Sequence, residues 1–235
     1  MTRNLILTGG IVHPFDRAAP ALAVMLDRHG IRSTVSEDIE AGLAAVARGE
    51  FDLLTIYALR WTMTQHEKYA ADRPRWGFSL SPQGRAAIVG HLARGGGLFG
   101  VHTASLCFDD WPQWGEVLGG AWVWGKSGHP PYGAARVRLD DRTHVLLRGL
   151  EDFELRDEVY GDLALAGDVA PLARASADGI TWQPVLCTRR VGAGRVVYDA
   201  LGHDADALAH PVHARIVARA AMLAAGRSES EVEKA

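Results

Sequence analysis

Short apolar runs alternate with amphipathic segments through the first hundred residues of the chain. The runs are rich in Leu, Ile and Val and predict buried strands over residues 4–8, 31–35, 52–57 and 98–101. The segments between them carry apolar residues at helical spacing, which predicts helices over residues 17–29, after a cap at Ser36, and after a cap at Ser81. Strands that alternate with helices in this way form parallel βαβ units. We therefore expect an α/β fold with a doubly wound, mainly parallel sheet of the flavodoxin-like type.

The second half of the chain is richer in strands. Its apolar and β-branched runs predict added strands over residues 134–139, 153–160, 184–190 and 195–201. Gly192-Ala193-Gly194 is typical of a hairpin turn between the last two. A last helix is predicted over residues 211–225. These elements complete one domain over residues 1–226, and the polar residues 227–235 are expected to form a frayed C-terminal tail.

Composition narrows the class of protein. The chain has 235 residues, 48% of them hydrophobic and 23% charged, which suits one domain with a sizeable core. Its net charge of −3 implies no broad basic face, so we expect no nucleic-acid partner and no membrane partner. The first apolar run is too short for a secretory signal, and the two cysteines form no metal-spaced set, so a cytoplasmic protein is expected. A homo-oligomer stays an open alternative, because nothing in the sequence locates an apolar pairing surface.

The segment Gly95 to Ser105 is the most informative in the chain. A glycine run ends a helix, a buried strand follows, and Gly100-Val101-His102-Thr103-Ala104 predicts a tight strand-to-helix turn. This pattern is typical of a nucleophile elbow, which projects one side chain from the end of a sheet. Here that side chain is His102, which can ligate a metal, polarise a carbonyl group or transfer a proton. The alternative is that His102 only caps the turn.

Two other histidines follow predicted strands in the same way. His13 comes after the first strand, and His203 follows the strand over residues 195–201. Ligands of open α/β sheets bind beyond the carboxyl ends of the strands, so we expect His13, His102 and His203 to converge there. The alternative is three loop histidines with incidental hydrogen bonds.

Two carboxylates accompany these histidines. Glu158 ends a predicted strand and is a candidate base or a group that orients an imidazole, although a solvated strand end or an ion pair with Arg156 is equally compatible. Asp109 follows the elbow and is a candidate for the same site. Helix capping is the alternative for Asp109 and its neighbour Asp110.

Aromatic residues predict a binding cleft. Of the seven tryptophans, all but Trp182 are predicted in loops or at loop edges, which favours a surface cleft over a core position. Flat aromatic faces suit the apolar faces of sugar rings, although they also suit ordinary packing. A long insertion over residues 59–80, rich in Arg, Trp and Tyr, is expected to be functional or mobile. The candidate substrate-binding residues from these segments are Arg60, Trp122, Trp124, His129 and Tyr132, together with His13.

Several motifs together resemble the trehalose-utilisation (ThuA-like) family. They span nearly the whole chain and are Gly100-Val101-His102-Thr103-Ala104, Asp109-Asp110-Trp111-Pro112, Leu118-Gly119-Gly120, Gly149-Leu150, Asp157-Glu158-Val159-Tyr160, Gly194-Arg195-Val196-Val197-Tyr198 and Leu201-Gly202-His203. This family is similar to class I glutamine amidotransferases, whose elbow holds a cysteine and whose later strand ends at the catalytic histidine. Those places fall to His102 and His203 here, so glutaminase chemistry through a thiolate is not available. The resemblance implies catabolism of disaccharides or their keto derivatives.

Three functions remain open on this sequence. The first is an enzyme that transfers a proton next to the carbonyl group of a keto sugar or keto-glycoside and so isomerises or cleaves it. In it His203 or Glu158 is the base, His102 stabilises the oxyanion with or without a metal, and His13 and Asp109 complete the pocket. The second is a metal-dependent hydrolase, in which the histidines bind a divalent ion such as zinc. The third is a non-catalytic carbohydrate-binding protein on an amidotransferase-like scaffold.

Overall fold

The computed structural model describes all residues, 1–235, and centres on a nine-stranded sheet with the order β2-β1-β3-β4-β11-β10-β9-β6-β7. The first five strands in this order run parallel, which confirms the predicted flavodoxin-like, doubly wound architecture. These strands are β1 (Thr2–Gly9), β2 (Ile31–Ser36), β3 (Leu53–Ala58), β4 (Gly97–Val101) and β11 (Gly194–Asp199). Every residue of β3 and β4 is buried, as expected for strands that are covered on both faces.

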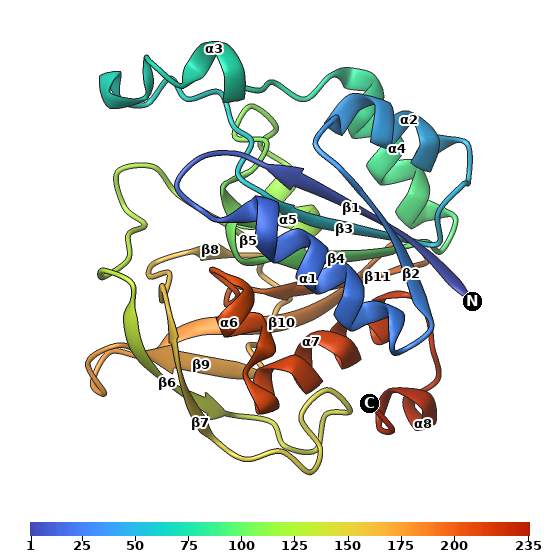
Figure 1. Ribbon diagram of the computed structural model, residues 1–235, viewed down its shortest axis with the longest axis vertical. Helices are drawn as coiled ribbons and strands as arrows, with labels where there is room; N and C mark the ends of the chain where they lie inside the picture. Colours follow the sequence, from blue (N-terminus) through green and yellow to red (C-terminus); the bar gives the residue numbers. More distant parts are fainter.

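Helices cover both faces of the parallel half of the sheet (Figure 1). α2 packs against α4 on one face, and α1 packs against α6 and α7 on the other. Their bounds are α1 (Phe15–Asp27), α2 (Ile39–Ala47), α4 (Pro82–Ala93), α6 (Ala205–Ala209) and α7 (Pro211–Ala224). The predicted cap of α4 is confirmed, because Ser81 Oγ accepts a 2.9 Å hydrogen bond from Gly84 N. The predicted cap of α2 is wrong: Ser36 still belongs to β2, and the Asp38 carboxylate caps the helix instead.

The other four strands extend the sheet in antiparallel fashion. They are β10 (Gln183–Val191), β9 (Ala173–Ser176), β6 (Gly133–Leu139) and β7 (Phe153–Asp157). The predicted hairpin between β10 and β11 is confirmed. No sequence pattern predicted β9, which has only four residues, two of them polar. β7 ends three residues earlier than predicted, because the Asp157 carboxylate accepts hydrogen bonds from Glu158 N and Gly202 N instead of continuing the strand.

Short elements fill the connections between the main ones. The insertion after β3 contains η1 (Glu67–Tyr69) and α3 (Arg73–Trp76), and the elbow after β4 begins η2 (His102–Leu106). α5 (Trp114–Leu118) follows, and β5 (Gly120–Ala121) pairs with β8 (Ala164–Leu165) in a separate small sheet. None of the helices is long and apolar enough to cross a membrane.

Two sequence-based expectations about packing are wrong. Trp61, Trp111 and Trp114 are buried in the core, because the loops that carry them fold back over the sheet, and of the three only Trp61 also borders the large cavity described below. The C-terminal segment is also not frayed. It forms α8 (Glu229–Val232), which a reciprocal capping box at Ser228 begins, and Val232 is fully buried.

Candidate functional site

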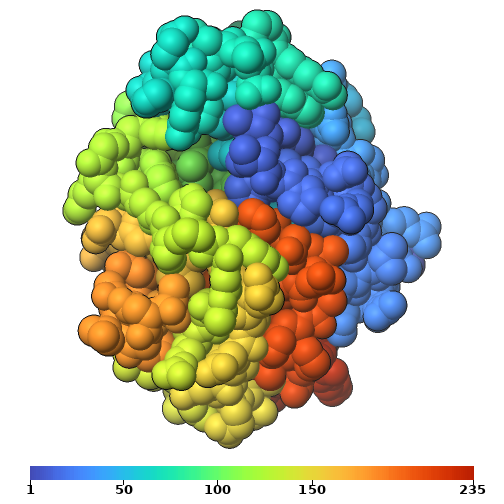
Figure 2. All heavy atoms as spheres, turned by 60° about the vertical axis from the view of Figure 1, so that its left-hand side comes forward, coloured from blue at the N-terminus to red at the C-terminus, as the bar shows by residue number.

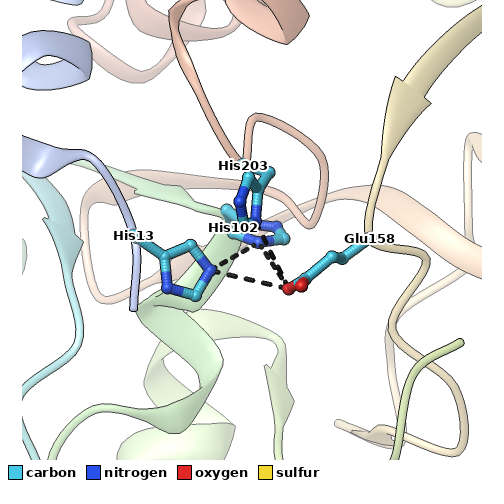
Figure 3. Close-up of side chains that lie close together, drawn as sticks. All are labelled: His13, His102, Glu158 and His203. Carbon is cyan, nitrogen blue, oxygen red and sulfur yellow. Dashed lines mark hydrogen bonds and ion pairs between the residues drawn. The ribbon is translucent and has the colours of Figure 1, made fainter. Parts of the chain in front are cut away.

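Four side chains meet beyond the carboxyl ends of the parallel strands. His13 follows β1, His102 follows β4, His203 follows β11, and Glu158 follows the antiparallel strand β7. Figure 3 shows the four side chains pointing toward one another from separate segments of the chain. We call them the His13–His102–Glu158–His203 cluster. The predicted convergence of the three histidines is therefore observed, and Glu158 joins them.

The elbow places His102 at the centre of the cluster. Its backbone has φ +46°, a left-handed conformation that few non-glycine residues adopt, and its side chain is completely buried. A β-carbon at Gly100 would lie 2.4 Å from Leu118 Cδ1 and 3.2 Å from Ala104 Cβ, so a larger residue there would displace side chains that pack behind the turn. Tyr198 holds the turn by donating a hydrogen bond to the His102 carbonyl oxygen. These contacts fix the imidazole in one orientation.

The first loop positions His13. A β-carbon at Gly10, which has φ +144°, would lie 2.5 Å from the Leu59 carbonyl oxygen, so only glycine lets this loop pass so close to the end of β3. The loop then turns His13 inward, and its ring stacks on Phe15 at 5.4 Å. The site edge of the sheet is thus built from short turns with little freedom.

The distances within the cluster are short. Glu158 Oε2 lies 3.3 Å from His203 Nδ1, 3.6 Å from His13 Nε2 and 3.8 Å from His102 Nε2. His13 Nε2 and His102 Nε2 are 3.1 Å apart. All four donor atoms lie within 4.8 Å of one another. Ligands 2.0–2.1 Å from a tetrahedral ion are about 3.3 Å apart, so these separations suit donors around one ion.

Hydrogen bonds on the outer side of the cluster set which nitrogen atoms face inward. His102 Nδ1 lies 2.8 Å from the Ala200 carbonyl oxygen, which can only accept, so Nδ1 carries the proton and the Nε2 lone pair faces the cluster. His13 Nδ1 lies 3.4 Å from the Ile11 carbonyl oxygen in the same manner. Backbone carbonyls that hold the outer nitrogen of a histidine are typical of metal ligands. His203 Nδ1 is buried and forms no hydrogen bond of good geometry, although Glu158 Oε2 lies 3.3 Å away.

The electrostatics keep the donors available. Burial, helped by the nearby His102 and His203 rings, lowers the pKa of His13 to about 4, although the Glu158 carboxylate opposes this shift. Burial alone would raise the pKa of Glu158, but the His102, His13 and His203 rings around the carboxylate hold it well below its usual range. Burial likewise opposes the charged form of His203, yet the Glu158 carboxylate raises the pKa of this ring. At neutral pH the cluster therefore offers an ionised carboxylate and a neutral His13.

The donor set fits a divalent transition metal. Three imidazole nitrogens and one carboxylate oxygen are ligands that zinc, iron, cobalt and manganese accept in proteins. The His203 Nδ1 atom without a well-formed hydrogen bond and the contact between two histidine nitrogens are both polar conflicts that a cation would remove. No other cluster of His, Cys, Asp and Glu side chains in the structure has this geometry.

A cavity of about 690 Å³ opens beside the cluster. His13, Glu158 and Tyr160 form its inner wall, Trp122 and Trp124 its side, and Lys68 and Asp72 belong to its lining from the insertion. In Figure 2 the cyan insertion, the blue N-terminal loop and the yellow-green segment near residue 125 border this hollow. Its size and aromatic lining are suitable for a small organic ligand that reaches the cluster.

The candidate binding residues divide between the cavity and its surroundings. Trp122, Trp124 and His129 line the cavity. Tyr132 lies behind it, with its ring 4.8 Å from that of His203 and its hydroxyl donating to Asp204. The structure does not bring Arg60 into the cavity lining, because its guanidinium lies over the rings of Trp76 and Phe78.

Asp109 lies outside the cluster. Its carboxylate accepts hydrogen bonds from Thr62 N and Thr62 Oγ1, at 2.8 and 2.7 Å, and from Gln65. It therefore holds the start of the insertion instead of reaching the histidines, and it caps no helix. The Asp110 carboxylate forms an ion pair with Arg85 at 2.8 Å, so it, too, is turned to other partners than the cluster.

Two residues at the site had no role in the sequence-based prediction. The buried Asp157 accepts hydrogen bonds from Gly202 N and His203 N, and so fixes the turn that carries His203. Burial raises the pKa of Asp157. The Tyr160 hydroxyl lies 3.0 Å from His102 Nε2. Both belong to the motif Asp157-Glu158-Val159-Tyr160. Which side chains of this motif point toward the cluster depends on where β7 ends.

The comparison with protein families decides the relationship. The family model described as "ThuA: Trehalose utilisation" matches residues 3–224. The chain belongs to the ThuA family. No curated protein sequence matches this ThuA chain.

Solved structures agree with that fold. A putative ThuA-like protein from Parabacteroides merdae is 18% identical and superposes with a TM-score of 0.73 over 96% of this chain and 91% of that one. A protein described as cytoplasmic from Salmonella typhimurium LT2 is 14% identical, with a TM-score of 0.55 over 91% and 92% of the two chains. The β-galactosidase from Rahnella sp. R3 is 15% identical, with a TM-score of 0.54 over 93% of this chain but 31% of its own. At these identities the likeness shows a shared fold.

Proposed function

We propose that this ThuA chain is a metal-dependent enzyme that transfers a proton next to the carbonyl group of a keto sugar or keto-glycoside. The observation that supports it most is the convergence of four donor atoms within 4.8 Å at the wall of an aromatic cavity. The family description, trehalose utilisation, supports a saccharide as the substrate. The indole rings of Trp122 and Trp124 offer flat apolar faces for a sugar ring.

Each member of the cluster has a part in this reaction. His13, His102 and His203 would hold the cation through nitrogen and Glu158 through Oε2, and a bound divalent cation would supply a Lewis acid that makes the neighbouring C–H bond of a ketone more acidic. Glu158 is the base. It is ionised, its Oε2 faces the three rings, and its Oε1 lies 3.7 Å from His129 Nδ1, at the cavity wall. The C–H bond breaks, its proton passes to the Glu158 carboxylate, and the electron pair enters the enediolate.

Metal-dependent hydrolysis is the second candidate, since His13 and Glu158 line the cavity, from which water reaches the cluster. A carbohydrate-binding protein without catalysis would use the same cavity. The three functions differ in what happens to the substrate and not in where it binds.

One experiment separates them. The protein is loaded with Zn²⁺ or Mn²⁺, incubated with 3-keto-trehalose in D₂O and followed by proton NMR. We expect deuterium to replace the hydrogen next to the carbonyl group, with isomerisation or loss of the glycosidic bond following. Release of glucose without deuterium uptake would favour hydrolysis, and line broadening without any turnover would favour a binding protein.

The matched variants are His102→Ala and His203→Ala, with His29→Ala as the control. His29 follows α1 and lies outside the cluster, so the control retains the donors. We expect the two cluster variants to lose turnover by at least a hundredfold, as the removal of metal ligands does. Full activity in both would refute the assignment of the site.

A further inference from the structure

Three buried tyrosines surround the elbow, and two of them have permanent acceptors. Tyr57 donates to the Gly202 carbonyl oxygen at 2.5 Å. Tyr198 lies 2.9 Å from the His102 carbonyl oxygen and 2.8 Å from Ser105 Oγ. Tyr160 differs, because its only partner is the imidazole of His102, at 3.0 Å from Nε2. A hydroxyl that is bonded to backbone keeps its partner in every state of the site, whereas one that is bonded to a metal ligand does not.

The Nε2 atom of His102 has more potential partners than lone pairs. Nδ1 donates to the Ala200 carbonyl oxygen, so Nε2 carries one lone pair and no proton in the neutral ring. Tyr160 must then donate to that lone pair. His13 Nε2 lies 3.1 Å from the same nitrogen, and Glu158 Oε2 lies 3.8 Å from it. A single lone pair cannot serve the hydroxyl and a cation at once.

A cation in the cluster takes this lone pair and leaves the Tyr160 hydroxyl without an acceptor. The residue is 2% exposed, so water replaces the lost partner only from the cavity side. A buried hydroxyl without a partner destabilises the site, which favours any oxygen that restores the hydrogen bond. The ring cannot turn away, because it stacks on His102 at 4.4 Å and meets Trp122 edge-on at 5.3 Å.

We infer that Tyr160 is a catalytic residue whose hydroxyl donates a hydrogen bond to the substrate oxygen that enters the cation site from the cavity. This inference rests on the proposed function. The oxygen is the carbonyl oxygen of an α-hydroxy ketone, and it gains negative charge as Glu158 removes the neighbouring proton. A fixed donor that is aimed at developing charge stabilises the transition state more than the ground state. The fold thus selects ligands with an oxygen acceptor at the cation.

The role of Tyr160 is tested by the binding of acetohydroxamate to Co²⁺-loaded protein. Acetohydroxamate is a suitable probe because it presents two adjacent oxygens, as an α-hydroxy ketone does. Co²⁺ binding and probe binding both change the visible absorption of the ion. The variant is Tyr160→Phe, and the control is Thr55→Val, which also removes one buried hydroxyl, bonded to Asn4 Oδ1 and not to the cluster. We expect Tyr160→Phe to bind Co²⁺ within about twofold of the unmodified protein but to bind acetohydroxamate at least tenfold more weakly. We expect Thr55→Val to lose stability and keep both affinities.

The outcomes distinguish this inference from the proposed function. If the unmodified protein does not bind Co²⁺, the metal centre and the role of Tyr160 both fail. If Co²⁺ binds and Tyr160→Phe holds acetohydroxamate as tightly as the unmodified protein, only the role of Tyr160 fails. A loss of Co²⁺ affinity in Tyr160→Phe would also overturn it, since the hydroxyl would then serve to hold the ligands in place.

Discussion

At the scale of single residues, backbone strain gathers next to the cluster. His102 has φ +46°, and Val12, directly before His13, has φ +59°. A β-branched residue in the left-handed region is unusual and carries a cost of about 1–2 kcal/mol. Val12 is also 78% exposed, so burial of its side chain does not offset that cost. The strain is therefore tolerated where the first loop turns His13 inward, next to the site.

Val12→Asn should relieve this strain. Asparagine adopts the left-handed region more readily than valine, so we expect the free energy of unfolding to rise by about 1 kcal/mol. Val24→Asn is the matched control, because Val24 is 60% exposed within α1 and its backbone is an ordinary helix. Urea denaturation of both variants provides the measurement. A stability gain in Val24→Asn as large as that in Val12→Asn would contradict the explanation.

At the scale of elements, β11 is tied to α7 by a buried ion pair. His213 Nε2 lies 2.9 Å from Asp199 Oδ2, and His213 Nδ1 lies 2.8 Å from the Ala207 carbonyl oxygen. Burial opposes the charge on the ring, but the Asp199 carboxylate outweighs it and raises the pKa of His213 to about 9. Asp199 Oδ1 also accepts from Leu201 N. The pair thus anchors the segment that leads to His203.

The His213–Asp199 pair should make stability depend on pH. The folded-state pKa lies above the unfolded value of about 6.5, so the folded protein binds the extra proton. Its contribution is complete below about pH 6.5 and is lost as the pH rises to about 9, a change on the order of 3 kcal/mol. Urea denaturation at pH 6.5 and pH 9 should show a larger fall in the free energy of unfolding for the unmodified protein than for His213→Gln. Equal falls would argue against a charged His213.

At the scale of the whole molecule, the C-terminal segment closes the fold. Val232 of α8 is fully buried, and Arg219 of α7 is 2% exposed. The Arg219 guanidinium donates to the carbonyl oxygens of Leu146, Arg148 and Glu233, so α8 supplies part of the partners of a buried cation. Arg227 donates to Thr2 Oγ1 and so joins the two ends of the chain.

Deletion of residues 228–235 should therefore destabilise the protein. The loss of the buried Val232 side chain and of one acceptor of Arg219 predicts a fall of about 2–4 kcal/mol in the free energy of unfolding. Val232→Ala separates the two contributions, and we expect about 1–2.5 kcal/mol from it alone. Thermal denaturation measures both. An unchanged melting temperature after the deletion would show that the segment contributes nothing.

The cluster also joins distant parts of the molecule, since its four donors follow β1, β4, β7 and β11. A cation that binds only the folded state should stabilise it by about 2.7 kcal/mol at a hundred times its dissociation constant. We expect Zn²⁺ to raise the melting temperature of the unmodified protein and of His29→Ala, and to raise that of His13→Ala much less. A similar rise in the melting temperature of His13→Ala would show that Zn²⁺ binds outside the cluster.

The sequence by itself determined the elements that local pattern specifies. Short apolar runs marked the five parallel strands, Ser81 marked the start of α4, and the glycines that precede Val101 and His102 marked the elbow. It also placed three histidines at one edge, because the carboxyl ends of parallel strands must lie together. These features depend on residues that are close in the sequence, which is why periodicity and turn chemistry could find them.

Only the tertiary structure decided which side chains meet. Glu158 joined the histidines and Asp109 did not, although both follow predicted elements, because β7 returns to the site edge while the Asp109 loop turns toward Thr62. Trp61 and Trp114 became core residues, and Tyr160 became a partner of His102, for the same reason. Such contacts join residues dozens of positions apart, and the packing of whole elements fixes them. No local pattern encodes that packing.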